Sequence, residues 1–376
     1  MLEKATRQQS KDHNTSLVLR TIYEARAVSR ADIARATSLA RPTVSTIVGE
    51  LIDNRLVSEI GLGPSAGGKP PTMLEINKNA WRLLCVDIGN QEFRGALVNL
   101  RGEIMERAEM PSNNQTGDAA LQLVYGLIDK LIGASPAPLL GIAVGAPGLI
   151  DPHERVIRQS VNLNWTNVPL GDLLEKRYDK PIYLANDSQA AALAEYTFGE
   201  VRESNHLLLI KMGRGIGAGI ILNRELFYGD SFSAGEIGQV VVRGENPPET
   251  LESIASTRAL LQRAQDVAGA DLTWDQFTAA VVKGDTLLRP IVEEAGYYLG
   301  IAIAHLIAVL NIHNIVISGR VTQFGEVLRQ KAYEAAYQHV LPMMIEDTNL
   351  TYSTLDTDNV LLGCSSLILK HELGIV

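Results

Sequence analysis

Cysteine is scarce in this 376-residue sequence, and a long apolar run is missing. The two cysteines, Cys85 and Cys364, lie far apart, one in an apolar stretch and one after a glycine. This placement is typical of small buried hydrophobic residues in a reduced, cytoplasmic protein and argues against a disulfide or a metal-binding pair. No run approaches the roughly 20 apolar residues of a membrane span. The polar first residues also lack the apolar segment of a secretory signal.

The rest of the composition is that of a globular protein, with 46% hydrophobic and 20% charged residues. The length suits two or three domains better than one compact core. The formal net charge of -9 is unevenly distributed: residues 1–80 contain 11 Lys and Arg against 8 Asp and Glu, and the remainder contains 23 against 35. A mildly basic segment on an acidic body can bind phosphate through that segment alone.

The first 80 residues follow the pattern of three helices and a two-stranded ribbon. Apolar residues at helical spacing predict a helix over 14–24, and Ser29 with Asp32 predicts an N-terminal cap for a second helix over 30–37. Pro42 opens a third helix that ends near Asn54. Strand-like stretches at 56–60 and 73–76 flank a loop rich in Gly and Pro. We therefore predict a winged helix-turn-helix, a DNA-binding domain over residues 1–80.

The third of these helices has a polar face opposite its apolar stripe. A helix that enters the major groove presents its first turns to base edges, for which Arg, Ser and Thr supply donors, acceptors and methyl groups. A wing residue, Lys69, would reach a phosphate or the minor groove. The alternative is a solvated face of a small packing domain. The predicted DNA-binding residues are Arg41, Pro42, Thr43, Ser45, Thr46 and Lys69.

Beyond a boundary at 77–81, strands and helices alternate. We predict strands at 83–88, 93–100, 104–110, 139–144 and 182–185, with helices at 118–131 and 188–195. A second cycle of strands starts at 206–211 and 217–222 and leads into mainly helical sequence up to residue 339, with a strand at 315–317. This pattern indicates an α/β body of two similar lobes over residues 81–376.

Glycine-rich turns follow several of these strands, at 87–89, 145–148 and 213–219. Glycines let backbone N–H groups approach an anion or a polyol, and an acid at a strand end can hold hydrated Mg²⁺. Each turn alone is equally compatible with a tight hairpin.

Polar residues also lie near the ends of several predicted strands. Asn186-Asp187 follows an apolar strand and precedes an Ala-rich helix, the usual ligand position in an open α/β fold. Carboxylates and amides there would bind adjacent sugar hydroxyls. The alternative for this pair alone is a helix N-cap. The candidate ligand-binding residues are Asn164, Asn186, Asp187, Glu236, Gln239 and Glu252.

Taken together, the motifs resemble the ROK family (repressors, open reading frames and kinases), specifically its regulator branch, over essentially the whole chain. The resemblance rests on the following segments: the wing 67–71, Asp87-Ile-Gly89, Gly145-Ala-Pro-Gly148, Asn186-Asp187, Gly215-Ile-Gly-Ala-Gly219, Ala234-Gly-Glu-Ile-Gly238 and Leu251-Glu-Ser-Ile-Ala-Ser256. It implies an actin-like ATPase fold, a sugar site in the cleft between two lobes, and dimers or tetramers.

The sequence departs from the kinases of that family at both phosphate turns. Where they carry Asp-Ile-Gly-Gly-Thr, this chain has Asn90 and Gln91 after Gly89; where they carry Gly-Thr-Gly, it has Arg214 between two glycines. Lost hydroxyls and added bulk crowd out the ATP phosphates. Asp187 matches the family's catalytic base and Asp87 its Mg²⁺-linked acid, but a base without a positioned phosphoryl donor does no chemistry. We therefore predict no kinase activity and a degenerate ATP site.

The family's structural zinc site is also missing from the sequence. Gly238 is followed by Gln239 instead of a histidine that touches the sugar in relatives, and residues 244–251 contain no cysteine. A zinc site of that kind needs thiolate and imidazole ligands. No bound metal is therefore expected.

These observations predict a cytoplasmic, homodimeric or tetrameric repressor whose affinity for a palindromic operator changes when a sugar binds. Two alternatives remain: an active sugar kinase with a DNA-binding head, and a regulator controlled by a protein partner. Residues Asn186, Asp187, Glu236 and Glu252 favour a sugar over a protein partner.

Overall fold

The computed structural model describes residues 7–64, 70–202, 204–244 and 247–375. The chain divides into two compact units. Unit 1 comprises residues 1–144, 169–184 and 364–376, and unit 2 comprises residues 145–168 and 185–363. The N-terminal segment thus belongs to unit 1. The predicted boundary near residue 80, between a DNA-binding and an effector domain, stays a prediction.

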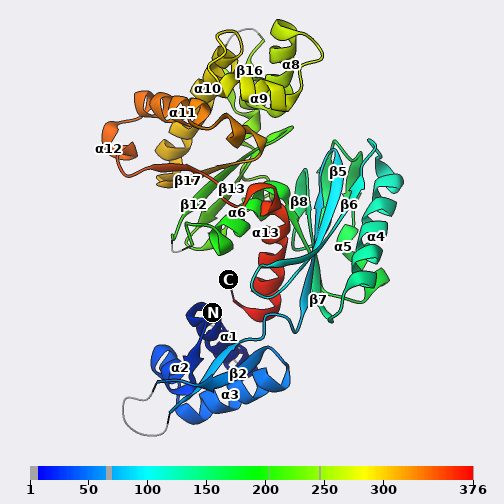
Figure 1. The fold of residues 1–376 in the computed structure, drawn as a ribbon, viewed down its shortest axis with the longest axis vertical. Coiled ribbons are helices and arrows are strands. Elements are labelled where there is room, and N and C mark those ends of the chain that lie inside the picture. Colours follow the sequence, from blue (N-terminus) through cyan, green and yellow to red (C-terminus); the bar gives the residue numbers. More distant parts are fainter. Residues whose placement is uncertain (1–6, 65–69, 203, 245–246, 376) are drawn as a thin grey trace. The chain divides into compact units, whose positions relative to one another are not determined.

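The N-terminal segment contains three helices and a small antiparallel sheet (Figure 1). The helices are α1 (Arg7–Ala25), α2 (Arg30–Thr37) and α3 (Arg41–Asp53). The strands are β1 (Val28–Ser29), β2 (Val57–Leu62) and β3 (Thr72–Ile76), in the order β1-β3-β2. All three helices and the pair β2–β3 match the sequence prediction. The third strand, β1, and the longer extent of α1 were not predicted.

Local sequence explains where these helices begin. The Ser29 side chain accepts a hydrogen bond from the Asp32 amide, and the Asp32 carboxylate accepts one from the Ser29 amide, which confirms the predicted cap of α2. Pro42 lies in the first turn of α3, where no intrahelical N–H is needed. Val44, Ile47, Val48 and Leu51 form the buried stripe of α3, so the opposite face is left for solvent or a partner.

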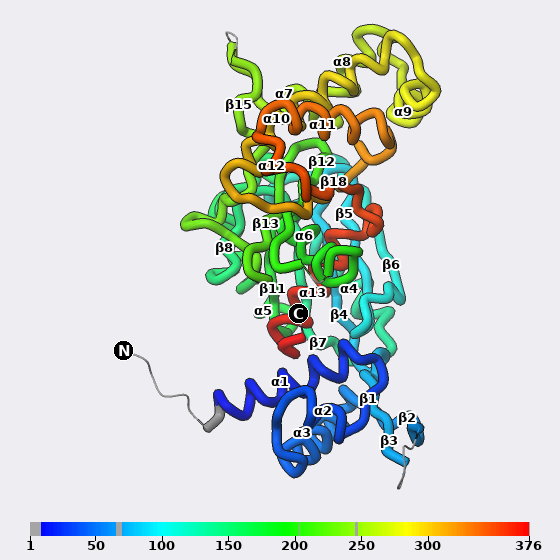
Figure 2. Tube along the Cα trace, turned by 90° about the vertical axis from the view of Figure 1, so that its left-hand side faces the viewer, coloured from blue at the N-terminus to red at the C-terminus, as the bar shows by residue number. Residues whose placement is uncertain are grey.

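The turn between two strands of unit 1, β5 (Glu92–Val98) and β6 (Ile104–Pro111), contacts the N-terminal segment. The Arg101 guanidinium donates a hydrogen bond to the Tyr23 carbonyl at 2.5 Å and lies 4.5 Å from the centre of the Tyr23 ring. Near the other end of the chain, Gly374 packs against Ser16 of α1, where the C-terminus lies in Figures 1 and 2. Two distant parts of the sequence therefore hold α1.

Unit 1 is built on a five-stranded sheet in the order β11-β7-β4-β5-β6. Its further strands are β4 (Arg82–Ile88), β7 (Leu139–Ala146) and β11 (Ile182–Asn186). Helix α4 (Gly117–Ala134) packs on β5 and β6 with its buried side, which includes Val124, Leu127 and Leu131. Every residue of β4 is buried, as expected for a central strand.

Unit 2 repeats this topology in the sheet β14-β13-β12-β17-β18. In both sheets the first strand along the chain is central, the second and third lie on one side, and the fourth and fifth on the other. The strands are β12 (Leu207–Met212), β13 (Ile216–Leu222), β14 (Glu225–Leu226), β17 (Asn314–Ser318) and β18 (Asn349–Tyr352). The predicted α/β body with two similar halves is therefore confirmed.

The remaining elements complete both units. In unit 1 there is α5 (Leu170–Tyr178), and the chain ends in the π-helical turn Leu369–Leu373. In unit 2 a small sheet of β8 (Leu149–Asp151), β9 (Val156–Ser160) and β10 (Trp165–Val168) precedes α6 (Asp187–Phe198). Later in unit 2 come β15 (Val241–Arg243), β16 (Glu249–Thr250), α7 (Leu251–Ala255), α8 (Thr257–Ala268), α9 (Trp274–Val282), α10 (Arg289–Leu310), α11 (Glu326–His339) and α12 (Pro342–Ile345), besides 3-10 turns at Ile237–Gln239, Arg320–Phe324 and Asp356–Asp358. Helix α13 (Asn359–Ile368) begins in unit 2 and ends in unit 1.

Helix α10 is the one described helix that is long and apolar enough to cross a membrane. It contacts α11 along its length and supplies Ala295, Leu299 and Ile303 to the hydrophobic core of unit 2. Burial against protein explains its apolar composition, because a core helix of a globular unit has the same residue content.

We expect Gly363→Ala to destabilise the protein. A methyl carbon at Gly363 of α13 would lie 1.8 Å from the Ala190 carbonyl oxygen of α6, so the helices would have to separate at a cost of about 1–3 kcal/mol. The matched control is Gly133→Ala near the end of α4, where nothing lies within 4 Å. It should instead stabilise slightly. Chemical denaturation measures both, and an unchanged midpoint for Gly363→Ala would contradict this packing.

Candidate functional site

Asn186 and Asp187 lie where β11 passes into α6. The Asn186 side-chain oxygen accepts hydrogen bonds from the amides of Ser188 at 2.8 Å and Gln189 at 3.3 Å, so Asn186 is the N-cap of α6. Its amide nitrogen donates to the Gly148 carbonyl at 3.0 Å. The N-cap alternative is therefore confirmed for Asn186. The same side chain also fixes the glycine turn at 145–148 against the start of the helix.

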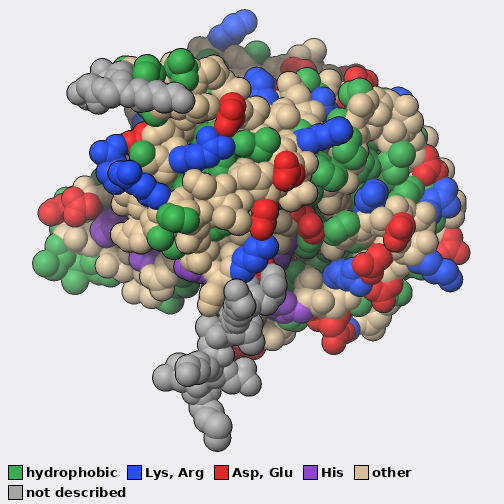
Figure 3. Space-filling view, turned by 90° about the horizontal axis from the view of Figure 1, so that it is seen from below, with side chains coloured by type: hydrophobic (Ala, Val, Ile, Leu, Met, Phe, Trp, Pro, Cys, Tyr) green, Lys and Arg blue, Asp and Glu red, His purple; other side chains and the backbone are tan. Residues whose placement is uncertain are grey.

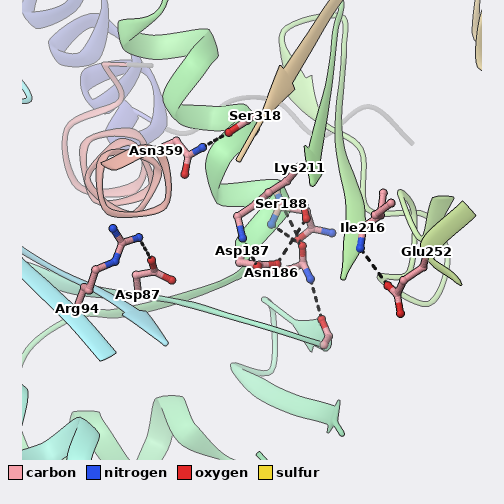
Figure 4. Close-up of polar contacts among 12 residues, drawn as sticks. Asp87, Arg94, Asn186, Asp187, Ser188, Lys211, Ile216, Glu252, Ser318 and Asn359 are labelled. Carbon is pink, nitrogen blue, oxygen red and sulfur yellow. Dashed lines mark hydrogen bonds and ion pairs between the residues drawn. The ribbon is translucent and has the colours of Figure 1, made fainter. Parts of the chain in front are cut away.

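Asp187, the first residue of α6, forms an ion pair that the sequence analysis missed. Its Oδ2 lies 2.5 Å from the Nζ of Lys211, near the end of β12 (Figure 4). Its Oδ1 lies 3.5 Å from the Ser188 hydroxyl. The side chains of Asp187 and Lys211 are each 23% exposed, so the pair is partly open to solvent. A lysine that interrupts the apolar run of β12 two residues before Gly213 was the available signal.

Glu252 supports the glycine-rich turn that precedes β13. Its Oε2 accepts a hydrogen bond from the Ile216 amide at 3.0 Å, as drawn in Figure 4. A Cβ atom added at Gly215 would lie 2.8 Å from that oxygen, and one added at Gly238 would lie 3.2 Å from it. The carboxylate therefore occupies the space that these two glycines leave.

Glu236 lies close to two other carboxylates. Although the residue is solvent-exposed, the protein around its carboxyl raises its pKa, and the negative charges of Asp187 and Glu252 raise that pKa further. Glu236, Asp187 and Glu252 thus interact electrostatically across three elements of unit 2. This arrangement brings several hydrogen-bond acceptors near one another.

The two remaining candidates lie at exposed positions. Gln239 ends the 3-10 turn and its amide donates to the Glu236 carbonyl at 3.2 Å. Asn164 lies in a turn before β10 with a left-handed backbone, φ 52°. All six candidate ligand-binding residues belong to unit 2. Their common origin means that one unit alone supplies the predicted sugar contacts.

The first phosphate turn of the sequence prediction lies in unit 1. Asp87 on β4 is buried and forms an ion pair with Arg94, its register partner on β5 (Figure 4). The backbone carbonyl of Asn90 accepts a hydrogen bond from the Ser112 hydroxyl at 2.7 Å, and that of Gln91 accepts one from the Ser112 amide at 2.8 Å. A carboxylate paired with arginine is a poor ligand for hydrated Mg²⁺, because the cation site already holds a positive charge.

The polar face of α3 is exposed as predicted. Arg41, Pro42, Ser45 and Thr46 are exposed and Thr43 is half-buried. Within the described part of the chain, Arg41 has no ion-pair partner. Lys69 lies outside the described residues. Figure 3 views the molecule from the side of the N-terminal segment, where Lys and Arg side chains lie among acidic ones.

The paired five-stranded sheets define the class of this protein, that of the actin-like fold on which sugar kinases are built. The ROK family profile matches residues 83–371. The chain belongs to the ROK family.

Three similar proteins extend the comparison. The xylose repressor of Caldicellulosiruptor bescii is 30% identical, over 97% of both chains. A solved ROK-family transcriptional regulator, a homologue of the Escherichia coli MLC protein, has a TM-score of 0.86 at 25% identity and covers 97% of this chain and 98% of its own. The glucokinase of Halalkalibacterium halodurans is 31% identical, over 76% of this chain and 94% of its own.

The raised pKa of Glu236 predicts an unusual pH dependence. The folded protein binds this proton more tightly than the unfolded chain, whose pKa is near 4.5, so this contribution to stability is present below that pH and is lost as pH rises. Glu236→Gln removes the charge. We expect its melting temperature to exceed that of the wild type at pH 7 and the difference to shrink toward pH 4.5. Glu109→Gln, at an exposed position of β6, is the control; a difference at Glu236 that does not change with pH would refute the prediction.

Proposed function

We propose that this protein is a sugar-responsive transcriptional repressor. The proposal rests on how much of this chain each kind of relative covers. The repressor relative and the regulator structure align over 97% of this chain, whereas the glucokinase covers 76% of it yet 94% of its own length. The part of this chain that the glucokinase does not cover is about as long as the segment of α1–α3 and β1–β3. That segment is therefore dispensable for phosphorylating a sugar.

We interpret that segment, residues 1–80, as a winged helix-turn-helix. Helix α3 is the proposed recognition helix, because its exposed first turns carry Arg41, Ser45 and Thr46 and its opposite face is buried. The strands β2 and β3 are the wing, with Lys69 between them. A homodimer or tetramer would present two such helices to a palindromic operator, and the protein would work in the cytoplasm, where that DNA is found.

The effector site in this proposal is the polar group of unit 2. Asp187, Glu236 and Glu252 supply carboxylate acceptors, and Asn164 and Gln239 supply amides. Asn186, which caps α6 through its oxygen and donates one N–H to Gly148, would contribute the second N–H of its amide. Such groups bind vicinal hydroxyls and discriminate against analogues that lack one. Sugar binding would then shift the equilibrium between DNA-binding and non-binding conformations.

Several contacts support the loss of kinase activity. Asp87 is paired with Arg94 and Asp187 with Lys211, so each carboxylate that the family resemblance implies for catalysis already has a cationic partner. Arg214 is exposed in the second phosphate turn. ATP with Mg²⁺ therefore fits these residues poorly. Zinc fits poorly as well, because both cysteines are buried and residues 239–251 contain none.

We expect Arg41→Ala to weaken binding to DNA fragments that the wild-type protein selects from a random pool. If Arg41 contacts a base, the loss should be about 1–3 kcal/mol. Lys69→Ala should weaken binding less and lower the salt dependence, as a phosphate contact would. Lys176→Ala, on the exposed side of α5, is the control. Gel-shift titrations at two salt concentrations measure all three variants. If Arg41→Ala and Lys69→Ala both bind as the wild type does, α3 and the wing are not the DNA-binding surface.

We expect the wild type to bind a sugar without phosphorylating it. Calorimetry with D-xylose, D-glucose and N-acetyl-D-glucosamine should show binding by at least one, and Asp187→Ala should abolish it while DNA binding without sugar is retained. Arg214→Thr alone should not restore phosphorylation, because the first phosphate turn remains altered.

The glucokinase relative makes an active kinase the second candidate function. Incubation of the wild-type protein with MgATP and each sugar separates the two. Turnover at about 1–100 per second, typical of kinases, would identify a bifunctional enzyme. Absence of binding to all three sugars would favour control by a protein partner.

A further inference from the structure

Lys211 is the charged residue in an otherwise apolar central strand. Residues Leu208, Ile210 and Met212 of β12 belong to the hydrophobic core that contains α10. Side chains alternate between the two faces of a strand, so Lys211 lies on the opposite face. Helix α6 packs on β12 and β13, and the Lys211 ammonium reaches Asp187 in its first turn.

The close approach of α6 to the sheet brings these two side chains together. Lys211 is the register partner of Gly217 on β13. A methyl carbon at Gly217 would lie 2.5 Å from the Ser188 hydroxyl, and one at Gly219 would lie 2.4 Å from the Ala192 side chain. The first turns of α6 therefore lie directly on the glycines of β13. Because no side chain at Gly217 or Gly219 separates this turn from β13, the lysine of the adjacent strand meets the Asp187 carboxylate at 2.5 Å.

Lys211 also offsets a local excess of negative charge. The Asp187 carboxylate interacts with Glu236, and Glu236 with Glu252. On the elements packed against the start of α6, β12 contributes Lys211 and β13 contributes no titratable group. The positive end of α6 stabilises the Asp187 anion, and the ammonium adds a direct partner.

We propose that Lys211 is a positioning residue for the sugar site: it holds Oδ2 of Asp187, so that the carboxylate is a fixed hydrogen-bond acceptor for a sugar hydroxyl. The inference rests on the proposed sugar binding. An acceptor held in one orientation binds a hydroxyl donor without reorganisation.

A double-mutant cycle tests whether Lys211 acts through Asp187. Calorimetry with the best-binding of D-xylose, D-glucose and N-acetyl-D-glucosamine compares the wild type, Lys211→Met, Asp187→Asn and the double variant. Hydrogen bonds to charged groups are strong, so Lys211→Met should weaken sugar affinity about tenfold to a hundredfold. In the Asp187→Asn background the same change should have less than about a twofold effect, because the charge that it positions is gone.

Three further variants complete the experiment. Lys211→Arg keeps the charge and should restore most of the affinity, a rescue that a purely structural role would not give. Lys211→Gln replaces the methionine variant if the melting temperature without sugar shows that the latter is unfolded. Lys283→Met, at an exposed position after α9, is the control and should bind as the wild type does.

The outcomes separate this inference from the proposed function. Both are supported if the wild type binds a sugar and Lys211→Met weakens that affinity when Asp187 is present but has little effect in the Asp187→Asn variant. Wild-type affinity in Lys211→Met, or equal losses in both backgrounds, overturns the role of Lys211 and leaves the sugar regulator intact. Failure of the wild type to bind any of the three sugars overturns both.

Discussion

The contact between α6 and the glycines of β13 determines where the polar groups of unit 2 lie. Backbone can approach backbone this closely only where no Cβ intervenes, and Gly217 and Gly219 provide that space against Ser188 and Ala192. Asn186 then caps the helix and binds the Gly148 carbonyl. On the far side of α6, Gly363 of α13 touches the Ala190 carbonyl. The helix is therefore held closely on two sides, and its first turn can keep Asp187 in one place.

Strong local signals made much of the fold predictable. The reciprocal hydrogen bonds of Ser29 and Asp32, the proline at the start of α3 and the apolar run 83–86 of β4 each act over a few residues, so sequence alone reveals them. The sheet of β8–β10 and the two-residue strand β1 were missed. Strands this short carry too few alternating residues for a pattern, and their pairing depends on chain segments that the fold brings together.

In the candidate site, too, the contacts made between distant parts of the chain were not predicted from sequence. Residue types and spacing drew attention to Asp87 and Asp187, but both cationic partners come from neighbouring strands. Arg94 could have been found, because a tight hairpin that pairs Ile88 with Phe93 must place Arg94 opposite Asp87. Lys211 depends on how closely a helix packs on the sheet, which is a tertiary property. The N-cap role of Asn186 was weighed from sequence, yet its second bond to Gly148 spans 38 residues.

The division of contacts between the two units bears on how such a protein can change over generations. Arg101 and Gly374, which hold α1, belong to unit 1, whereas all six proposed sugar contacts belong to unit 2. Substitutions that alter which small molecule is recognised can therefore accumulate in one half without disturbing the residues that seat the N-terminal helices. A lineage can in this way acquire a new signal while it keeps its old set of target genes.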